Sequence, residues 1–140
     1  MARFSKLGEH AAIWLALGVN ASIAAPAAER RRWRAATATV AGAYLANTTI
    51  KLAVRRPRLA GLPPLTSTPT QLSFPSAHAT SSFAAARVYS AAGAPAAPLY
   101  ALAAAFAASR VYLGVHYPSD VLAGALLGSA IGAVAVGRRG

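Results

Sequence analysis

Hydrophobic residues gather in five long stretches, and the segments between them carry most of the charged residues. The stretches span residues 11–28, 35–54, 78–92, 96–115 and 121–136. A helix needs about 20 apolar residues, with a lower limit near 17, to cross a bilayer. The first, second and fourth stretches meet this length, the third is short, and the fifth approaches it if residues 118–120 form its first turn. The pattern therefore predicts one all-α domain over residues 1–140, a polytopic membrane bundle of about five transmembrane helices.

The charged residues indicate how these helices are oriented. Residues 29–34, ERRRWR, are expected to join the first two helices, and Arg138 and Arg139 close the chain. Five alternating helices would place both clusters on one side, which the excess of positive charge marks as cytoplasmic. The loop 55–74 and the turn near 110–118 then share the extracytoplasmic face.

Arg87 is the charged residue inside the third stretch. On a helix that rises about 1.5 Å per residue, it lies near the cytoplasmic end. We expect its side chain to reach the interface there or to pair with Glu29, and a catalytic role is not favoured.

The fifth stretch carries small residues at a spacing of four, at Gly124, Gly128 and Gly132. This spacing places them on one face of a helix, where a neighbouring helix can approach closely. Packing inside the bundle is favoured over a dedicated dimer face, and the pattern does not predict an oligomeric state.

Composition narrows the classes of partner and cofactor. Hydrophobic residues make up 56% of the chain and charged residues 12%, with a net charge of +11. A basic chain can bind nucleic acid, but this one lacks the polar surface of a soluble binder, so membrane lipids and an anionic substrate are the expected partners. Without cysteine there is no zinc-thiolate site, and three acidic residues are too few for a carboxylate-rich metal site. We therefore expect neither a metal nor a cofactor.

Three segments on the outer side carry groups that membrane helices rarely contain. The first, KLAVRRPR at 51–58, separates Lys51 and Arg58 by six residues, so the helix end and the following loop can direct both cations into one pocket. A basic run beside a helix is often a topology signal or a contact with lipid headgroups. Here it lies on the side where basic residues are disfavoured, which favours a functional role.

The second and third segments add hydroxyl, imidazole and carboxylate groups. In FPSAHAT at 74–80, Ser76 opens a helix whose first N–H groups form an anion site, with His78 beside it. In SRVYLGVHYPSD at 109–120, Arg110 precedes a turn across which His116 and Asp120 can meet. The carboxylate can then fix the imidazole tautomer and leave the other ring nitrogen free to attack.

Together these residues suit phosphoryl transfer without a metal. Three cations and a hydroxyl can bind a phosphate dianion, two histidines can attack and protonate the leaving group, and one carboxylate can orient the attacking histidine. The set is Lys51, Arg58, Ser76, His78, Arg110, His116 and Asp120.

The three segments resemble those of the type 2 phosphatidic acid phosphatases, whose pocket is shared with vanadium haloperoxidases. The family pattern is Lys, six residues and Arg-Pro; Pro-Ser-Gly-His; and Ser-Arg, five residues, His, three residues, Asp. All spacings are kept between residues 51 and 120, while Leu59 replaces a Pro and Ala77 replaces a Gly. Ala77 retains the N–H that contacts phosphate, and a helical φ in the first turn accommodates it.

The resemblance implies a six-helix membrane core, of which we count five helices, and a role for each site residue. His116 is the nucleophile that forms a phosphohistidine, Asp120 orients it, and His78 is the acid for the leaving alcohol and then the base that activates water. The phosphoryl oxygens are held by Lys51, Arg58, Arg110, Ser76 and the Ala77 N–H. The implied protein is an integral membrane phosphatase with its active site on the extracytoplasmic face of the cytoplasmic membrane.

The substrate follows less directly from the residues. Stretches such as FSKLGEH and SRVYLGVHYPSDVLAGALLG look like short actinobacterial members of the family, which are linked to removal of the 5-phosphate from decaprenylphosphoryl-5-phosphoribose on the route to cell-wall arabinan. Undecaprenyl diphosphate, phosphatidylglycerophosphate and phosphatidic acid remain alternative substrates. A non-catalytic lipid transporter or membrane assembly subunit is the alternative from another class, which the intact His78, His116 and Asp120 disfavour.

Overall fold

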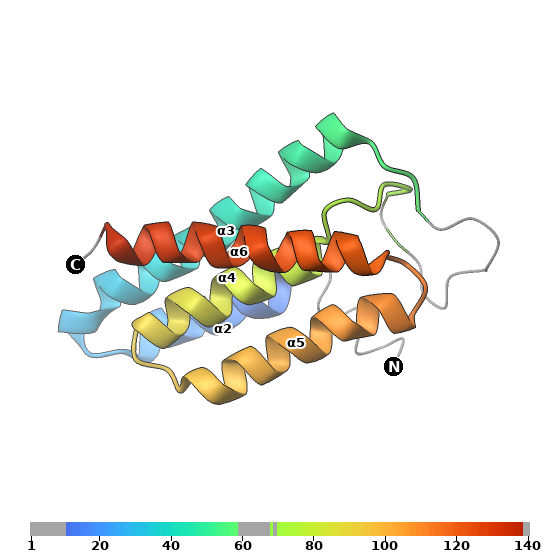
Figure 1. Ribbon diagram of the computed structural model, residues 1–140. Coiled ribbons are helices and arrows are strands. Elements are labelled where there is room, and N and C mark those ends of the chain that lie inside the picture. Colours follow the sequence, from blue (N-terminus) through green and yellow to red (C-terminus); the bar gives the residue numbers. More distant parts are fainter. Residues whose placement is uncertain (1–10, 59–67, 69, 139–140) are drawn as a thin grey trace.

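The computed structural model describes residues 11–58, 68 and 70–138, and within these ranges the chain forms five helices and no β-strand. The helices are α2 (Ala12–Ala24), α3 (Ala27–Val54), α4 (Ala77–Ala91), α5 (Ala96–Tyr112) and α6 (Pro118–Gly137). Figure 1 shows them as one elongated bundle, in which α4 packs against α2, α3, α5 and α6. The all-α prediction is confirmed, and each helix contains most of one predicted apolar stretch; the first stretch, 11–28, was predicted too long, since α2 ends at Ala24 and residues 27 and 28 begin α3.

The helices differ in how well they match a membrane span. Among the described residues, only α6 is both long and apolar enough to cross a bilayer, and α2 is a shorter apolar helix. Pro118 is the first residue of α6, so residues 118–120 form the first turn of that helix as expected.

The start of α3 differs from the sequence prediction. Residues 29–34, which we expected to form a loop between two helices, lie inside α3, and the connection from α2 is only Ala25 and Pro26. Arg and Glu are good helix formers, and a Pro directly before the first helical residue has a suitable φ of −54°. Glu29 in the first turn also complements the positive end of the helix dipole.

The basic cluster at the start of α3, residues 29–34, lies at the end of the bundle opposite the α5–α6 turn (Figure 1). Figure 1 shows the C-terminal end of α6 beside the first turns of α3, so Arg138 and residues 29–34 share one end. Arg139 lies outside the described residues. The expected pair between Arg87 and Glu29 is not formed, since the ion pairs among described residues involve only Asp120 as the acid.

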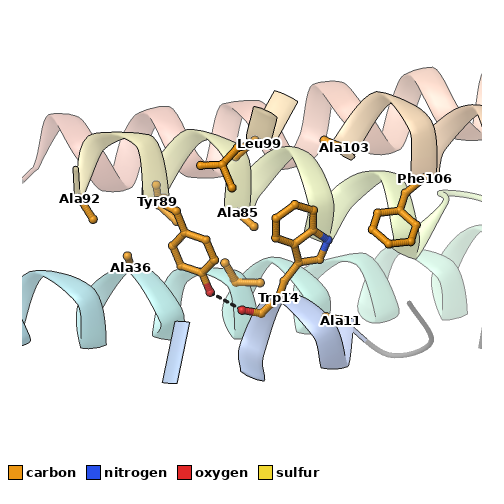
Figure 2. Packing of buried hydrophobic residues seen from close by; sticks show 12 residues of the cluster. Ala11, Trp14, Ala36, Ala85, Tyr89, Ala92, Leu99, Ala103 and Phe106 are labelled. Atoms are coloured by element: carbon orange, nitrogen blue, oxygen red, sulfur yellow. Dashed lines mark hydrogen bonds between the residues drawn. The ribbon is translucent and has the colours of Figure 1, made fainter. Parts of the chain in front are cut away.

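Aromatic side chains from three helices form the centre of the core, and polar contacts fasten α2 to it. Trp14 packs edge-on against Phe106 with ring centroids 6.2 Å apart. Its Nε1 donates to Ser82 Oγ at 2.8 Å. The Tyr89 hydroxyl donates to the Trp14 carbonyl at 2.7 Å (Figure 2). These buried donors are therefore paired, as buried polar groups in folded proteins usually are.

The glycine stripe of α6 packs against α4, as the favoured interpretation predicted. Gly124, Gly128 and Gly132 are all buried. A Cβ at Gly128 would lie 2.1 Å from the Thr80 carbonyl oxygen, and a Cβ at Gly124 would lie 2.6 Å from that of Ser76. The close approach of α6 therefore requires glycine, and it brings the first turn of α6 against the start of α4.

This contact predicts opposite effects for two glycine substitutions. Gly128→Ala forces the backbones of α4 and α6 apart, and we expect a cost of about 1–3 kcal/mol. Gly42→Ala is the control, because a Cβ there meets nothing within 4 Å, and the helix propensity of alanine should stabilise by about 1 kcal/mol. Thermal unfolding in one detergent should place the two variants on opposite sides of the wild type; equal stabilities would contradict the packing.

Candidate active site

The three segments singled out in the sequence meet at one end of the bundle. There α3 ends, α4 begins, and the α5–α6 turn lies beside them (Figure 1). A short antiparallel pairing joins the segments after α3 and before α4: Pro57 bridges to Leu72, the Arg58 N–H donates to the Gln71 carbonyl at 3.0 Å, and the Ser73 N–H donates to the Arg56 carbonyl at 2.8 Å. This pairing places Arg58 next to the start of α4.

His116 and Asp120 face each other across the turn before α6. His116 Nδ1 lies 3.5 Å from Asp120 Oδ2, and both side chains are buried. That separation is an ion-pair distance but is too long for a well-formed hydrogen bond. The same oxygen accepts from the Tyr117 N–H at 2.9 Å, so the carboxylate also caps the first turn of α6.

The other ring nitrogen of His116, Nε2, lies beside the guanidinium of Arg58. Arg58 Nη1 lies 3.4 Å from His116 Nε2 and donates to the Val115 carbonyl, and Arg58 Nε donates to Thr70 O at 2.8 Å. Burial, followed by the charges of Arg58, Lys51, His78 and Arg110, lowers the pKa of His116 from 6.5 to about 2. The imidazole is therefore neutral and carries a lone pair on one ring nitrogen, which is Nε2 beside Arg58 in the tautomer with its proton on Nδ1.

Lys51 reaches the loop before α4. Its Nζ donates to the Pro75 carbonyl at 2.9 Å and lies 3.4 Å from those of Leu72 and Ser73. The sequence predicted a phosphate contact for this ammonium. The structure shows it holding three loop carbonyls, while its charge still reaches His116.

The first turn of α4 supplies the remaining groups. Ser76 is the N-cap, its Oγ 3.5 Å from the Ala79 nitrogen, and its own N–H donates to the Asp120 carbonyl at 3.0 Å. Ala77 is the first residue of the helix, with the helical φ that its substitution for glycine needs. Its N–H belongs to the first turn, whose donors have no partner within the helix.

Two further predicted residues lie at the same end. His78 is partly buried in the first turn of α4, close enough for its charge to lower the pKa of His116. Arg110 is buried in the last turn of α5, with Nε 3.3 Å from Ser109 Oγ. Leu59, the other departure from the family pattern, lies outside the described residues. Within the described part, no three His, Asp or Glu side chains are grouped as metal ligands.

One residue in this arrangement was not predicted from the sequence. Arg56 Nη1 donates to Asp120 Oδ1 at 2.8 Å and to Ser119 Oγ at 2.9 Å. A buried carboxylate is costly without a cation, so the isolated Asp120 in the sequence was itself a signal that a partner was needed. The run RRPR at 55–58 offered three candidates without distinguishing them.

Comparison with known proteins adds a family and two relatives. The family model described as PAP2 superfamily matches residues 32–138. A Mycobacterium tuberculosis protein named decaprenylphosphoryl-5-phosphoribose phosphatase is 44% identical over 132 residues, which cover 93% of this chain and 73% of that protein. A protein of the same name from Mycolicibacterium smegmatis is 46% identical over 123 residues, covering 86% and 67% of the two chains. No solved structure matches the chain significantly.

Proposed function

The chain belongs to the PAP2 superfamily and is a phosphatase, and we propose that it removes the 5-phosphate of decaprenylphosphoryl-5-phosphoribose, a step toward cell-wall arabinan. The observation that carries the substrate is the similarity to two relatives of that name, at 44% and 46% identity over most of the chain. The match includes all the segments that form the candidate site.

We assign the chemistry to His116, with Asp120 as its orienting group. His116 Nε2 attacks phosphorus, the bond to the ribose oxygen breaks, and a phosphohistidine forms. Two observations support this choice. The imidazole lies between the Asp120 carboxylate and the Arg58 guanidinium, and its lowered pKa keeps it neutral, with a lone pair available. A neutral imidazole is the nucleophilic form.

His78 completes the cycle in this proposal. It protonates the departing ribose oxygen and then takes a proton from the water that attacks the phosphohistidine, which releases phosphate and restores His116. The phosphoryl oxygens are bound by Lys51, Arg58 and Arg110, together with Ser76 and the N–H of Ala77. Their positive charges compensate the charge that develops on the transferring group.

Metal independence is the first expected result. The three cations supply what Mg²⁺ supplies in other phosphatases, and the chain has only three acidic residues to bind a divalent ion. Activity should survive EDTA, and vanadate, which adopts the geometry of the transition state, should inhibit competitively. Complete loss in EDTA with recovery in Mg²⁺ would exclude this mechanism.

We further propose that the bundle is embedded in the cytoplasmic membrane. Large hydrophobic side chains point outward from several helices, including Ile23 of α2, Leu45 of α3, and Leu122 and Leu126 of α6, which are 64–72% exposed. Exposed apolar surface on several faces of one molecule favours a lipid environment over water. The substrate, a lipid-linked phosphate, would then reach the site from the membrane.

The site is proposed to face the extracytoplasmic side, because Arg138 and residues 29–34 lie at the opposite end of the bundle. The chain has no cysteine, so single cysteines can report sidedness. Gln71→Cys, at the site end, and Ala97→Cys, in the first turn of α5 at the other end, are both exposed positions. An impermeant thiol reagent on intact cells should label only position 71; labelling only at position 97 would invert the orientation.

The substrate is tested by a panel of purified lipid phosphates at one concentration in one detergent. Decaprenylphosphoryl-5-phosphoribose should give the highest kcat/KM, ahead of undecaprenyl diphosphate, phosphatidylglycerophosphate and phosphatidic acid. A higher value for one of the other three would replace the proposed substrate and keep the enzyme class. No phosphate release from any of them would favour a non-catalytic transporter or assembly subunit.

A further inference from the structure

We propose that Arg56 is a positioning residue of this phosphatase, which holds the Asp120 carboxylate in the orientation that His116 requires. The inference rests on the proposed function, because it takes His116 to be the nucleophile. It adds a residue outside the set that the sequence motifs define.

The contact between Arg56 and Asp120 is the closest ion pair in the described part of the chain. Arg56 Nη1 lies 2.8 Å from Asp120 Oδ1, and the two side chains are 36% and 0% exposed. Hydrogen bonds between two ionised groups are short and strong, and burial of one partner strengthens them further. Removing the guanidinium would leave a fully buried carboxylate without this cation, and only Oδ2 would keep its hydrogen bond from the Tyr117 N–H.

The two oxygens of Asp120 are divided between separate partners. Oδ1 accepts from Arg56, while Oδ2 accepts from the Tyr117 N–H at 2.9 Å and faces His116 Nδ1 at 3.5 Å. The plane of the carboxylate is thus set by Arg56 on one side and by the backbone on the other. His116 meets an acceptor that is already oriented, which is the preorganisation that catalysis requires.

Arg56 is itself fixed on the first turn of α6. Its guanidinium carbon lies 4.0 Å from the centroid of the Tyr117 ring, and Nη1 also donates to Ser119 Oγ at 2.9 Å. Cation–π contact and hydrogen bonding restrain the side chain together. These contacts tie Arg56 to Asp120 and its neighbours, in contrast to Arg58, whose Nη1 faces the His116 nitrogen that attacks.

The test compares substitutions at two adjacent arginines. Arg56→Gln should lower kcat by about 10- to 100-fold, the loss expected when a reacting group shifts by about 1 Å. KM and the inhibition constant of inorganic phosphate should change by less than about twofold, since a residue that binds phosphate would alter both and a positioning residue would not. Arg56→Lys should recover part of kcat. Arg55→Gln, which removes the same charge from an exposed side chain, should behave as wild type.

A double-mutant cycle decides whether the effect passes through Asp120. In an Asp120→Asn background, Arg56→Gln should lower kcat by less than about threefold further, because the pair it serves is already broken. The proposal would be overturned if the kcat loss of the double variant equalled the product of the losses of the two single variants. It would also be overturned if Arg56→Gln raised KM and left kcat unchanged, or if the Arg56 and Arg55 variants behaved alike. If Arg56→Gln fails to fold, Arg56→Lys in both backgrounds decides by the same criterion.

The assay separates this inference from the substrate proposal. All variants are measured with p-nitrophenyl phosphate as well as with the lipid. If the wild type cleaves only the former, the lipid assignment fails while the Arg56 series remains readable.

Discussion

His116→Ala is expected to abolish turnover of every substrate, with a loss on the order of 10⁴- to 10⁶-fold. The reason is that a nucleophile cannot be replaced by improved binding, and His78, in the first turn of α4, has the separate role of acid and base in the proposed cycle. The measurement is phosphate release from the lipid and nitrophenol release from p-nitrophenyl phosphate. Binding should persist, because Lys51, Arg58 and Arg110 are unchanged, so inorganic phosphate should still protect the variant against thermal unfolding.

The covalent intermediate gives this prediction a direct readout. Wild type quenched during turnover of a ³²P-labelled substrate should carry label that is stable in base and lost in acid, as expected of a phosphoramidate. His116→Ala should carry none. Label retained by the variant, or activity above about one per cent of wild type, a loss well short of the one expected for a missing nucleophile, would assign the nucleophile to another residue.

The positions of the helices follow from hydrophobicity because side chains on the outer surface and toward the core are both largely apolar. The first turns of α3 do not, because five of residues 29–34 are charged and their conformation depends on the propensity of Arg and Glu. The exception is Trp33, which packs against the core beside Tyr89. A rule that ends a membrane helix at the first charged cluster therefore places its start too late. The charged side chains remain exposed at the end of the bundle.

The site shows a similar division between spacing and tertiary contact. The spacing between His116 and Asp120 is local, so one turn before a helix is enough to predict that they meet. Arg56 and Asp120 are 64 residues apart, and their contact exists because the segment after α3 crosses the first turn of α6. Arg55, Arg56 and Arg58 are alike in the sequence, and only this crossing distinguishes them.

For Lys51 the motif identifies the residue, but the spacing alone does not predict its contacts. Its place in the motif predicts a phosphate ligand, but an ammonium also satisfies carbonyl groups of a neighbouring loop. The three carbonyls between residues 72 and 75 converge on it. Spacing identifies the residue that belongs to the site, whereas its contacts depend on how the neighbouring loop is folded.

His78→Ala should separate substrates by their leaving groups. A ribose or prenol alkoxide has a pKa far above neutrality and needs a proton as it departs, so the loss with the lipid should be about 10²- to 10⁴-fold, the usual value of general acid catalysis. Nitrophenolate departs without a proton. With p-nitrophenyl phosphate the variant should therefore release a burst of nitrophenol at close to the wild-type rate, followed by slow turnover, because the water that hydrolyses phosphohistidine now lacks its base.

The burst rate distinguishes the loss of a catalytic acid in His78→Ala from a general distortion of the pocket. A distorted pocket would slow the first step with both substrates, whereas loss of the acid slows it only with the lipid. His78→Ala should also accumulate the base-stable ³²P label that His116→Ala lacks, since its phosphoenzyme forms but is hydrolysed slowly. Asp120→Asn is the reference for misorientation of the nucleophile, and it should reduce the burst rate with both substrates without trapping label. Equal losses of the burst step for His78→Ala with both leaving groups would show that His78 is not the acid, and the proton would then have to come from solvent or from a cation of the pocket.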